Sequence, residues 1–242
     1  MLLSCCGRRA AFSFFVGGVT VTQQAQRSVV AITGGMGSGK SSVAAYLCEI
    51  GGARGLSADT LCRQLLEPKA AGWLAVRKAF GEKFFLADQY IDRPLLRKVL
   101  FEDSAFRHEL NTLLHPLVRN EITDRIAKEI EHLAESKTQS QARFVVEVPL
   151  LYEAQWEQDF SQIVVAYADE KACQRRIMLR DGISEAEAEK AMATQMSLSD
   201  KARLADHVID NSGAWPETCL QIVHLRNLLW EGIGFGGGRL LK

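Results

Sequence analysis

A glycine-rich stretch near the start of the chain carries the residue types that hold phosphate groups. Gly34, Gly39, Lys40 and Ser41 match the pattern G-x-x-x-x-G-K-[ST] within "VVAITGGMGSGKSSVAAYL", residues 29–47. Glycines let backbone N–H groups converge on phosphate oxygens, because a side chain there would block the approach. The lysine can reach the β- and γ-phosphates, and the serine hydroxyl can ligate Mg²⁺. The pattern predicts a site for a nucleoside triphosphate.

The elements on either side of this loop match what the pattern requires. Residues 29–33 form a continuous apolar, β-branched run, which is typical of a strand buried on both faces of a parallel sheet. Residues 39–50 have helical spacing, and the N-terminus of a helix attracts anions. This context disfavours the alternative of a glycine-rich turn with a chance lysine. We expect the backbone N–H groups of this loop and the side chains of Lys40 and Ser41 to contact the phosphates.

A carboxylate ends the second predicted strand, residues 53–59. We expect this strand to lie beside the strand of the phosphate loop, at the edge where open parallel sheets bind ligands. Asp59 could then deprotonate an acceptor hydroxyl, or hold Mg²⁺ through water. It could equally be the N-cap of a helix over residues 60–66, and position alone leaves the two open.

Two arginines and a histidine are further candidates. Arg176 and Arg180 are four residues apart on a predicted helix that ends at Gly182, so both can point at one anion. Arginines neutralise the charge that spreads over phosphate oxygens during transfer, although a surface helix with salt bridges is the alternative. His115, directly before Pro116, is either a buried residue at a helix end or a ligand contact.

The rest of the chain alternates strands with helices. Further strands are predicted at residues 144–151, 163–169 and 207–213. Helices are predicted at residues 93–101, 103–116, 117–133, 184–195 and 214–230. The second of these should begin on an Asp cap and stop at Pro116, and the fourth begins with a capping box of Ser184 and Glu187. The alternation predicts an α/β fold with a mostly parallel five-stranded sheet.

Composition narrows the function classes. Lys+Arg and Asp+Glu are both 29, so the basic excess of a nucleic-acid binder is absent. No apolar run has the length of about 20 residues that a membrane-spanning helix needs. The six cysteines form no C-x-x-C pair and are expected to be free thiols.

Both termini differ from the rest. Residues 1–28 contain three arginines and no acidic residue, with an apolar run at 10–21. An extension without function or a mis-assigned start, an organelle transit peptide and a secretion signal remain open. Residues 232–242 hold five glycines and predict a flexible tail.

Three classes of nucleotide-binding protein compete for the phosphate loop. A GTPase would carry N-K-x-D, which is absent, and its D-x-x-G would come soon after the loop rather than at residues 210–213. A motor-type ATPase would have a strand ending on an aspartate and a larger chain. A small-molecule kinase needs an acid near the γ-phosphate and arginines over the phosphates, which Asp59, Arg176 and Arg180 could supply.

Taken together, six segments resemble one family, the dephospho-CoA kinases, over residues 29–230. The segments are "TGGMGSGKSSVA" (33–44), "ADTLCRQLLEP" (58–68), "LLHPLV" (113–118), "VPLLYE" (148–153), "RRIMLRDG" (175–182) and "ADHVIDNSG" (205–213). Many kinases share the first segment. The order and separation of "HPL", "PLLYE" and "VIDNSG" are much more specific.

The resemblance implies a P-loop NTPase three-layer fold with a helical acceptor-binding insertion at about residues 60–140 and a helical lid at about 170–200, within a kinase domain of 29–231. The implied reaction moves the γ-phosphoryl group of ATP onto the ribose 3′-hydroxyl of dephospho-CoA, with Mg²⁺, as the last step of coenzyme A synthesis. A cytoplasmic monomer or weak homo-oligomer, without nucleic-acid or membrane partners, is expected. Mitochondria or another organelle are the alternative if residues 1–28 are a transit peptide.

The resemblance also implies roles for single residues. ATP is expected to contact Gly35, Gly37, Ser38, Gly39, Lys40, Ser41 and Ser42. Asp59 takes the place of the catalytic base, Arg176 and Arg180 fall on the lid, and Asn211 falls in the turn beside the adenine. The acceptor side is expected to include His115, Pro149, Leu150 and Glu153. Ser57 stands where relatives often have the first acid of D-A-D, which puts the contacts of that acid in doubt. A kinase of another nucleoside or small alcohol, and a nucleotide-binding module without catalysis, remain as alternatives.

Overall fold

The computed structural model describes residues 15–16, 19–20, 29–135 and 142–231. The chain forms two compact units, one of Met1–Gly55 with Gln139–Lys242 and one of Leu56–Thr138. The expected flexible tail lies outside the described residues. So does most of the N-terminal extension, of which only the short antiparallel strands β1 (Phe15–Val16) and β2 (Val19–Thr20) are described.

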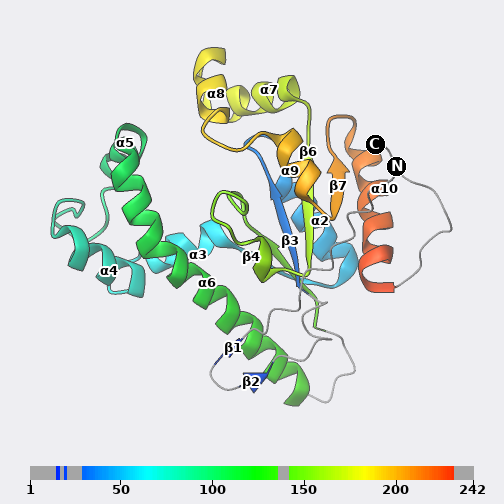
Figure 1. Cartoon of the computed structure of the whole chain (residues 1–242), viewed down its shortest axis with the longest axis horizontal. Coiled ribbons are helices and arrows are strands. Elements are labelled where there is room, and N and C mark those ends of the chain that lie inside the picture. Colours follow the sequence, from blue (N-terminus) through cyan, green and yellow to red (C-terminus); the bar gives the residue numbers. More distant parts are fainter. Residues whose placement is uncertain (1–14, 17–18, 21–28, 136–141, 232–242) are drawn as a thin grey trace, which may run out of the picture. The chain divides into compact units, whose positions relative to one another are not determined.

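A five-stranded sheet dominates the first unit (Figure 1). Its strands are β3 (Val29–Gly34), β4 (Arg54–Ser57), β5 (Phe144–Glu147), β6 (Gln162–Tyr167) and β7 (His207–Asp210). The strand order is β4-β5-β3-β6-β7, and β3 runs parallel to both β5 and β6, as β6 does to β7. The predicted α/β fold and parallel sheet are confirmed.

The expected neighbour of the phosphate-loop strand is wrong. β5 lies between β3 and β4, because the chain passes from β3 out to the sheet edge and only later returns to fill the intervening place. The backbone N–H of Arg54 donates to the carbonyl of Arg143, 2.7 Å away, just before β5 begins. The carboxyl end of β5, rather than that of β4, therefore lies next to the phosphate loop.

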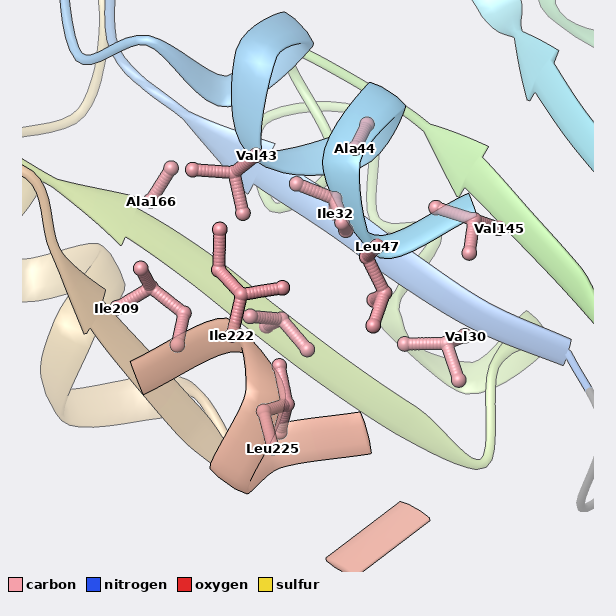
Figure 2. Packing of buried hydrophobic residues seen from close by; sticks show 11 residues of the cluster. Val30, Ile32, Val43, Ala44, Leu47, Val145, Ala166, Ile209, Ile222 and Leu225 are labelled. Carbon is pink, nitrogen blue, oxygen red and sulfur yellow. The ribbon is translucent and has the colours of Figure 1, made fainter. Parts of the chain in front are cut away.

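The core of the first unit fixes the sheet against two helices, α2 (Lys40–Gly51) and α10 (Trp215–Arg226). Figure 2 shows Ile32 of β3 and Ala166 of β6 packed with Val43 of α2 and Ile222 of α10. Ala31, which alternates with these strand residues and points to the other face, is fully buried as well. Burial on both faces explains why the strand reads as one apolar run, and each large apolar side chain buried contributes about 1.5–3 kcal/mol.

Among its described residues, the first unit also has the helices α7 (Glu170–Asp181), α8 (Glu185–Met192) and α9 (Leu198–Leu204), with the short turns η1 (Glu157–Asp159) and η2 (Asn227–Glu231). Sequence signals set their ends. Gly182 ends α7 at φ 65°, and Ser184 with Glu187 forms the predicted capping box of α8. Among the described helices, none is both long and apolar enough to cross a membrane.

The second unit is helical, with α3 (Ala58–Leu65), α4 (Ala71–Phe80), α5 (Arg93–Glu102) and α6 (Ser104–Glu135). Its core is formed by Trp73, Val76, Phe84, Ile91, Leu96, Leu110 and Leu114. Asp103 accepts the N–H of Phe106 at 2.9 Å, so the predicted Asp cap is confirmed.

The expected stop at Pro116 is wrong, because α6 continues through it as one helix. A proline inside a helix removes a hydrogen bond and costs about 3 kcal/mol. Leu114 before it and Val118 after it are both buried, so both halves of α6 gain packing energy from one continuous apolar stripe. Tertiary packing here outweighs the local signal.

Candidate active site

The phosphate loop follows β3 and leads directly into α2. Gly37 and Gly39 have φ of 74° and 82°, a conformation that favours glycine. A Cβ at Gly37 would collide with the backbone carbonyl of Cys173, and one at Gly39 with the side-chain amide of Asn211. These two glycines are therefore required both for their backbone conformation and for the close approach of α7 and the β7 turn.

Three carbonyls of the phosphate loop accept hydrogen bonds from side chains. The Gly35 carbonyl accepts from the Ser38 hydroxyl at 3.0 Å, and the Gly37 carbonyl accepts from Arg176 Nη1 at 3.2 Å. The Ser38 carbonyl accepts from Asn211 Nδ2 at 2.9 Å. A phosphate site needs amide hydrogens, not carbonyl oxygens, facing the anion. These contacts engage three of the loop carbonyls with donors of the protein and stabilise one conformation of the loop.

Asn211 is buried, and both the nitrogen and the oxygen of its side-chain amide make hydrogen bonds. Besides its bond to the loop, its Oδ1 accepts from the Thr218 hydroxyl at 3.1 Å. Its carbonyl accepts from Arg176 Nη2 at 2.8 Å, so one guanidinium joins the turn after β7 to the phosphate loop. The contacts of Asn211 hold the loop, while its expected place beside the adenine stays a prediction.

The two arginines of α7 make different contacts. Arg176 is half-buried against the loop, whereas Arg180 is exposed and donates two bonds of 2.8 Å to the carboxylate of Asp181. That pairing raises the pKa of Arg180 above its usual range. The structure brings Arg176 to the phosphate loop and leaves Arg180 on the surface, so their joint action on one anion stays a prediction.

A carboxylate that the sequence analysis missed lies at the phosphate loop. Ser41, at the start of α2, donates its hydroxyl to Glu147 Oε1 at 2.6 Å. Glu147 ends β5, in register with Ile32 of β3. The available signal was an acid inside the apolar strand predicted at residues 144–151, which the structure ends at Glu147. A strand ending on an acid was considered only for motor-type ATPases.

This pair fits a magnesium ion. Mg²⁺ takes few protein oxygen ligands and keeps water and phosphate oxygens for its other positions. A serine hydroxyl hydrogen-bonded to a carboxylate is a donor set of that kind. Among the described residues no cluster of three or more His, Cys, Asp or Glu side chains could hold a metal, so a site built only from protein ligands is absent there.

The acceptor-side candidates of the "PLLYE" segment are held by a buried lysine. Lys201 of α9 is completely buried, and its Nζ donates to the Pro149 carbonyl and pairs with Glu153 Oε1, both at 2.9 Å. Glu153 also accepts the N–H of Met196 at 2.9 Å. Leu150 is exposed. Of the three predicted residues here, Glu153 is engaged by Lys201, whereas Leu150 has an exposed side chain; Lys201 was not predicted.

Asp59 and His115 belong to the second unit. Ser57, not Asp59, is the N-cap of α3, because its hydroxyl accepts the N–H of Thr60 at 3.4 Å. Serine caps helices about as well as aspartate, so the departure from D-A-D keeps the cap and loses only a charge. Asp59 is exposed in the first helical turn. Its alternative role as N-cap is wrong.

His115 lies inside α6, so its alternative as a residue at a helix end is also wrong. It is half-buried, and this burial, helped by the charge of Arg119, lowers its pKa. A neutral imidazole follows at neutral pH, able to donate one hydrogen bond and accept another.

The comparisons with known proteins agree with this geometry. The family model "Dephospho-CoA kinase" matches residues 28–217. The dephospho-CoA kinase of Shouchella clausii is 37% identical over 193 residues, which are 80% of this chain and 94% of that protein. The chain belongs to the dephospho-CoA kinase family. The expectation of a kinase of coenzyme A biosynthesis is thereby confirmed.

Two further comparisons extend this result. The dephospho-CoA kinase of Symbiobacterium thermophilum is 34% identical over 194 residues, covering 80% of this chain and 78% of that protein. A crystal structure of TT1252 from Thermus thermophilus has a TM-score of 0.67 and 28% identity, covering 85% of this chain and 98% of that one. The matched region of the dephospho-CoA kinase model contains every segment on which the resemblance was based.

Proposed function

We propose that this chain transfers the γ-phosphoryl group of ATP to the ribose 3′-hydroxyl of dephospho-CoA in a Mg²⁺-dependent reaction. The observation that carries the proposal is the phosphate loop with its carbonyls hydrogen-bonded to side chains and a carboxylate, Glu147, bonded to Ser41, in a chain of this family. A loop serine beside a carboxylate is the arrangement by which P-loop proteins hold the Mg²⁺ of a bound nucleoside triphosphate.

On the donor side, the loop amides and the N-terminus of α2 bind the phosphates. Lys40, the first residue of α2, neutralises charge on the β- and γ-phosphates. Ser41 and Glu147 would hold Mg²⁺, directly and through water. When bound, the ion offsets the charge on the phosphate oxygens. Because these groups are positioned before the reaction, they stabilise the transferred group without a cost of reorganisation.

On the acceptor side, Asp59 takes the proton of the 3′-hydroxyl as its oxygen bonds to the γ-phosphorus. The bond from that phosphorus to the β–γ bridging oxygen breaks, and ADP leaves. His115 and the exposed Leu150 are acceptor contacts. Pro149 and Glu153 act through the fold of their loop, since Lys201 already engages both. Arg176 orders the phosphate loop through its hydrogen bond to the Gly37 carbonyl. Arg180 contacts phosphate once it releases Asp181.

The Asp59→Asn variant tests this proposal. It keeps the size of the side chain and removes the basic oxygen, so kcat should fall by about 100-fold or more while ATP affinity stays the same. Asp124→Asn, at an exposed aspartate of α6, is the matched control and should leave kcat unchanged. Equal kcat in Asp59→Asn and the unaltered chain would refute the role of Asp59 as base.

Three finer expectations belong to the same proposal. We expect a cytoplasmic location, with an organelle as the alternative. Mass spectrometry of the mature N-terminus tests this, because a mature chain that starts at Met1 excludes a cleaved leader. A monomer or weak homo-oligomer is tested by sedimentation over a range of concentrations. Loss of turnover on removal of Mg²⁺, and its recovery on addition, tests the metal requirement.

A further inference from the structure

One segment of the chain touches both the phosphate loop and the "PLLYE" segment. We call residues 195–201 the strap; they run from the turn after α8 into α9. At its start, Gln195 Oε1 accepts the backbone N–H of Met36 at 3.1 Å. Leu198 packs on Gly35, where an added Cβ would lie 3.2 Å from its side chain. The strap therefore contacts two consecutive residues of the phosphate loop.

The contact of Gln195 fixes the orientation of one peptide group of the loop. That peptide joins Gly35 to Met36, and its carbonyl is already held by the Ser38 hydroxyl at 3.0 Å. Gln195 holds the N–H at the opposite end. Arg176 and Asn211, by contrast, each hold a loop carbonyl. A peptide held at both ends cannot turn its carbonyl toward the anion site, where that oxygen would repel phosphate.

The other end of the strap is fixed by an ion pair of which one member is buried. Lys201 is completely buried, while the side chain of Glu153 is 24% exposed, and their charged atoms are 2.9 Å apart. Glu153 also accepts the N–H of Met196, the residue directly after Gln195. Burying an ammonium group is costly, and apolar replacements of buried pairs are often neutral or stabilising. The pair thus adds little to stability but sets the backbone position of the strap next to Gln195.

We propose that Gln195 is a positioning residue of the nucleotide site, held in place by the Lys201–Glu153 pair. It acts through the Met36 peptide, which keeps the phosphate loop in its anion-binding form. This inference rests on the proposed function only in requiring that the loop bind a nucleoside triphosphate. The amide oxygen of Gln195 must be the atom that faces Met36, because a backbone N–H needs an acceptor.

The first test measures binding of a fluorescent ATP analogue to the full chain, without dephospho-CoA, in the Gln195→Met variant. This change keeps the length of the side chain and removes the acceptor. We expect about tenfold weaker binding, equivalent to about 1.4 kcal/mol, with KM for dephospho-CoA unchanged. The matched control is Gln174→Met, which loses an exposed bond of 3.2 Å to Glu189 between α7 and α8. The control should bind the analogue like the unaltered chain.

A second variant tests whether Gln195 lies at the nucleotide site rather than only stabilising the fold. Gln195→Glu keeps an acceptor for Met36 but adds a negative charge beside a loop that takes phosphates. Its ATP affinity should be weak at low salt and approach that of the unaltered chain at high salt, because salt screens the repulsion. An affinity that does not respond to salt in this variant would contradict the location of Gln195 at the nucleotide site.

A double-mutant cycle tests the role of the ion pair between Lys201 and Glu153. Lys201→Met with Glu153→Gln removes both charges, which avoids leaving either charge without its partner, and keeps an acceptor for Met196. This pair of changes should weaken ATP binding alone, but add little when Gln195→Met is already present, because all act through one contact. Additive effects would refute the anchoring role.

The outcomes distinguish this inference from the proposed function. If Gln195→Met binds the analogue as tightly as Gln174→Met, while the unaltered chain binds ATP and phosphorylates dephospho-CoA, the inference alone is wrong. If the unaltered chain binds no nucleotide, the proposed function itself is contradicted.

Discussion

Replacing Gly39 with alanine should break the contact between the phosphate loop and the turn after β7. Gly39 has φ 82° and ψ 21°, in the left-handed region. An added Cβ would overlap Asn211 Nδ2, the atom that donates to the Ser38 carbonyl at 2.9 Å. Alanine therefore meets two separate costs, one in the backbone and one in the displaced amide.

The two costs can be estimated and separated. A residue with a Cβ in the left-handed conformation costs about 1–2 kcal/mol. A buried carbonyl left without its donor costs about 1–3 kcal/mol more, for a total of about 2–5 kcal/mol. Gly52, at φ 60° and ψ 32°, has nothing within 4 Å of its added Cβ. Gly52→Ala should therefore show the backbone cost alone.

The assay is urea unfolding of the full chain, with the free energy of unfolding obtained by linear extrapolation. Asn211→Ala removes the amide that Gly39→Ala displaces. The loss of unfolding free energy in the double variant Gly39→Ala/Asn211→Ala should therefore be smaller than the sum of the losses in the two single variants. The affinity for an ATP analogue should fall in Gly39→Ala and stay the same in Gly52→Ala. Equal loss of stability in Gly39→Ala and Gly52→Ala, or strict additivity with Asn211→Ala, would refute the reasoning.

Two further predictions concern metal use and pH. Glu147→Gln still offers an acceptor to Ser41 but no charge, so initial rates should require about tenfold or more Mg²⁺ for half saturation; an unchanged magnesium dependence would argue against the metal site. Burial lowers the pKa of His207, with a smaller opposing effect of Asp206, so the unfolded chain takes up the proton first as the pH falls. Stability from this group is complete above its ordinary pKa of about 6.5 and is lost as the pH falls toward the lowered value. His207→Gln should flatten the decline in unfolding free energy between about pH 7 and 5, and an equally steep decline in both chains would contradict it.

The phosphate loop and its flanking elements could be predicted because their signals are local. The β-branched run of β3, the glycines with positive φ and the helical spacing of α2 all lie within residues 29–51, and the structure has the strand, loop and helix there. The capping box at Ser184 is local in the same sense.

The contacts that complete the site are not local, and they were missed. Ser41 and Glu147 are 106 residues apart, and Ser38 and Asn211 are 173 apart. Both depend on strand order, which the alternation of strands and helices does not determine. Because the strand order was unknown, β4 was expected beside β3, and the acid at the end of β5 was not recognised as part of the site. Pro116 was a different failure, in which buried residues on both sides outweighed a strong local signal.

The central claim is that the chain phosphorylates the ribose 3′-hydroxyl of dephospho-CoA. The most direct measurement incubates the full chain with Mg²⁺, dephospho-CoA and ATP labelled in the γ-phosphate, followed by isolation of the product and treatment with a 3′-nucleotidase. The label should appear in coenzyme A, should be released by the nucleotidase, and should be absent from a parallel reaction with Lys40→Ala. Label that stays in ATP, or that enters another nucleoside but not dephospho-CoA, would contradict the account.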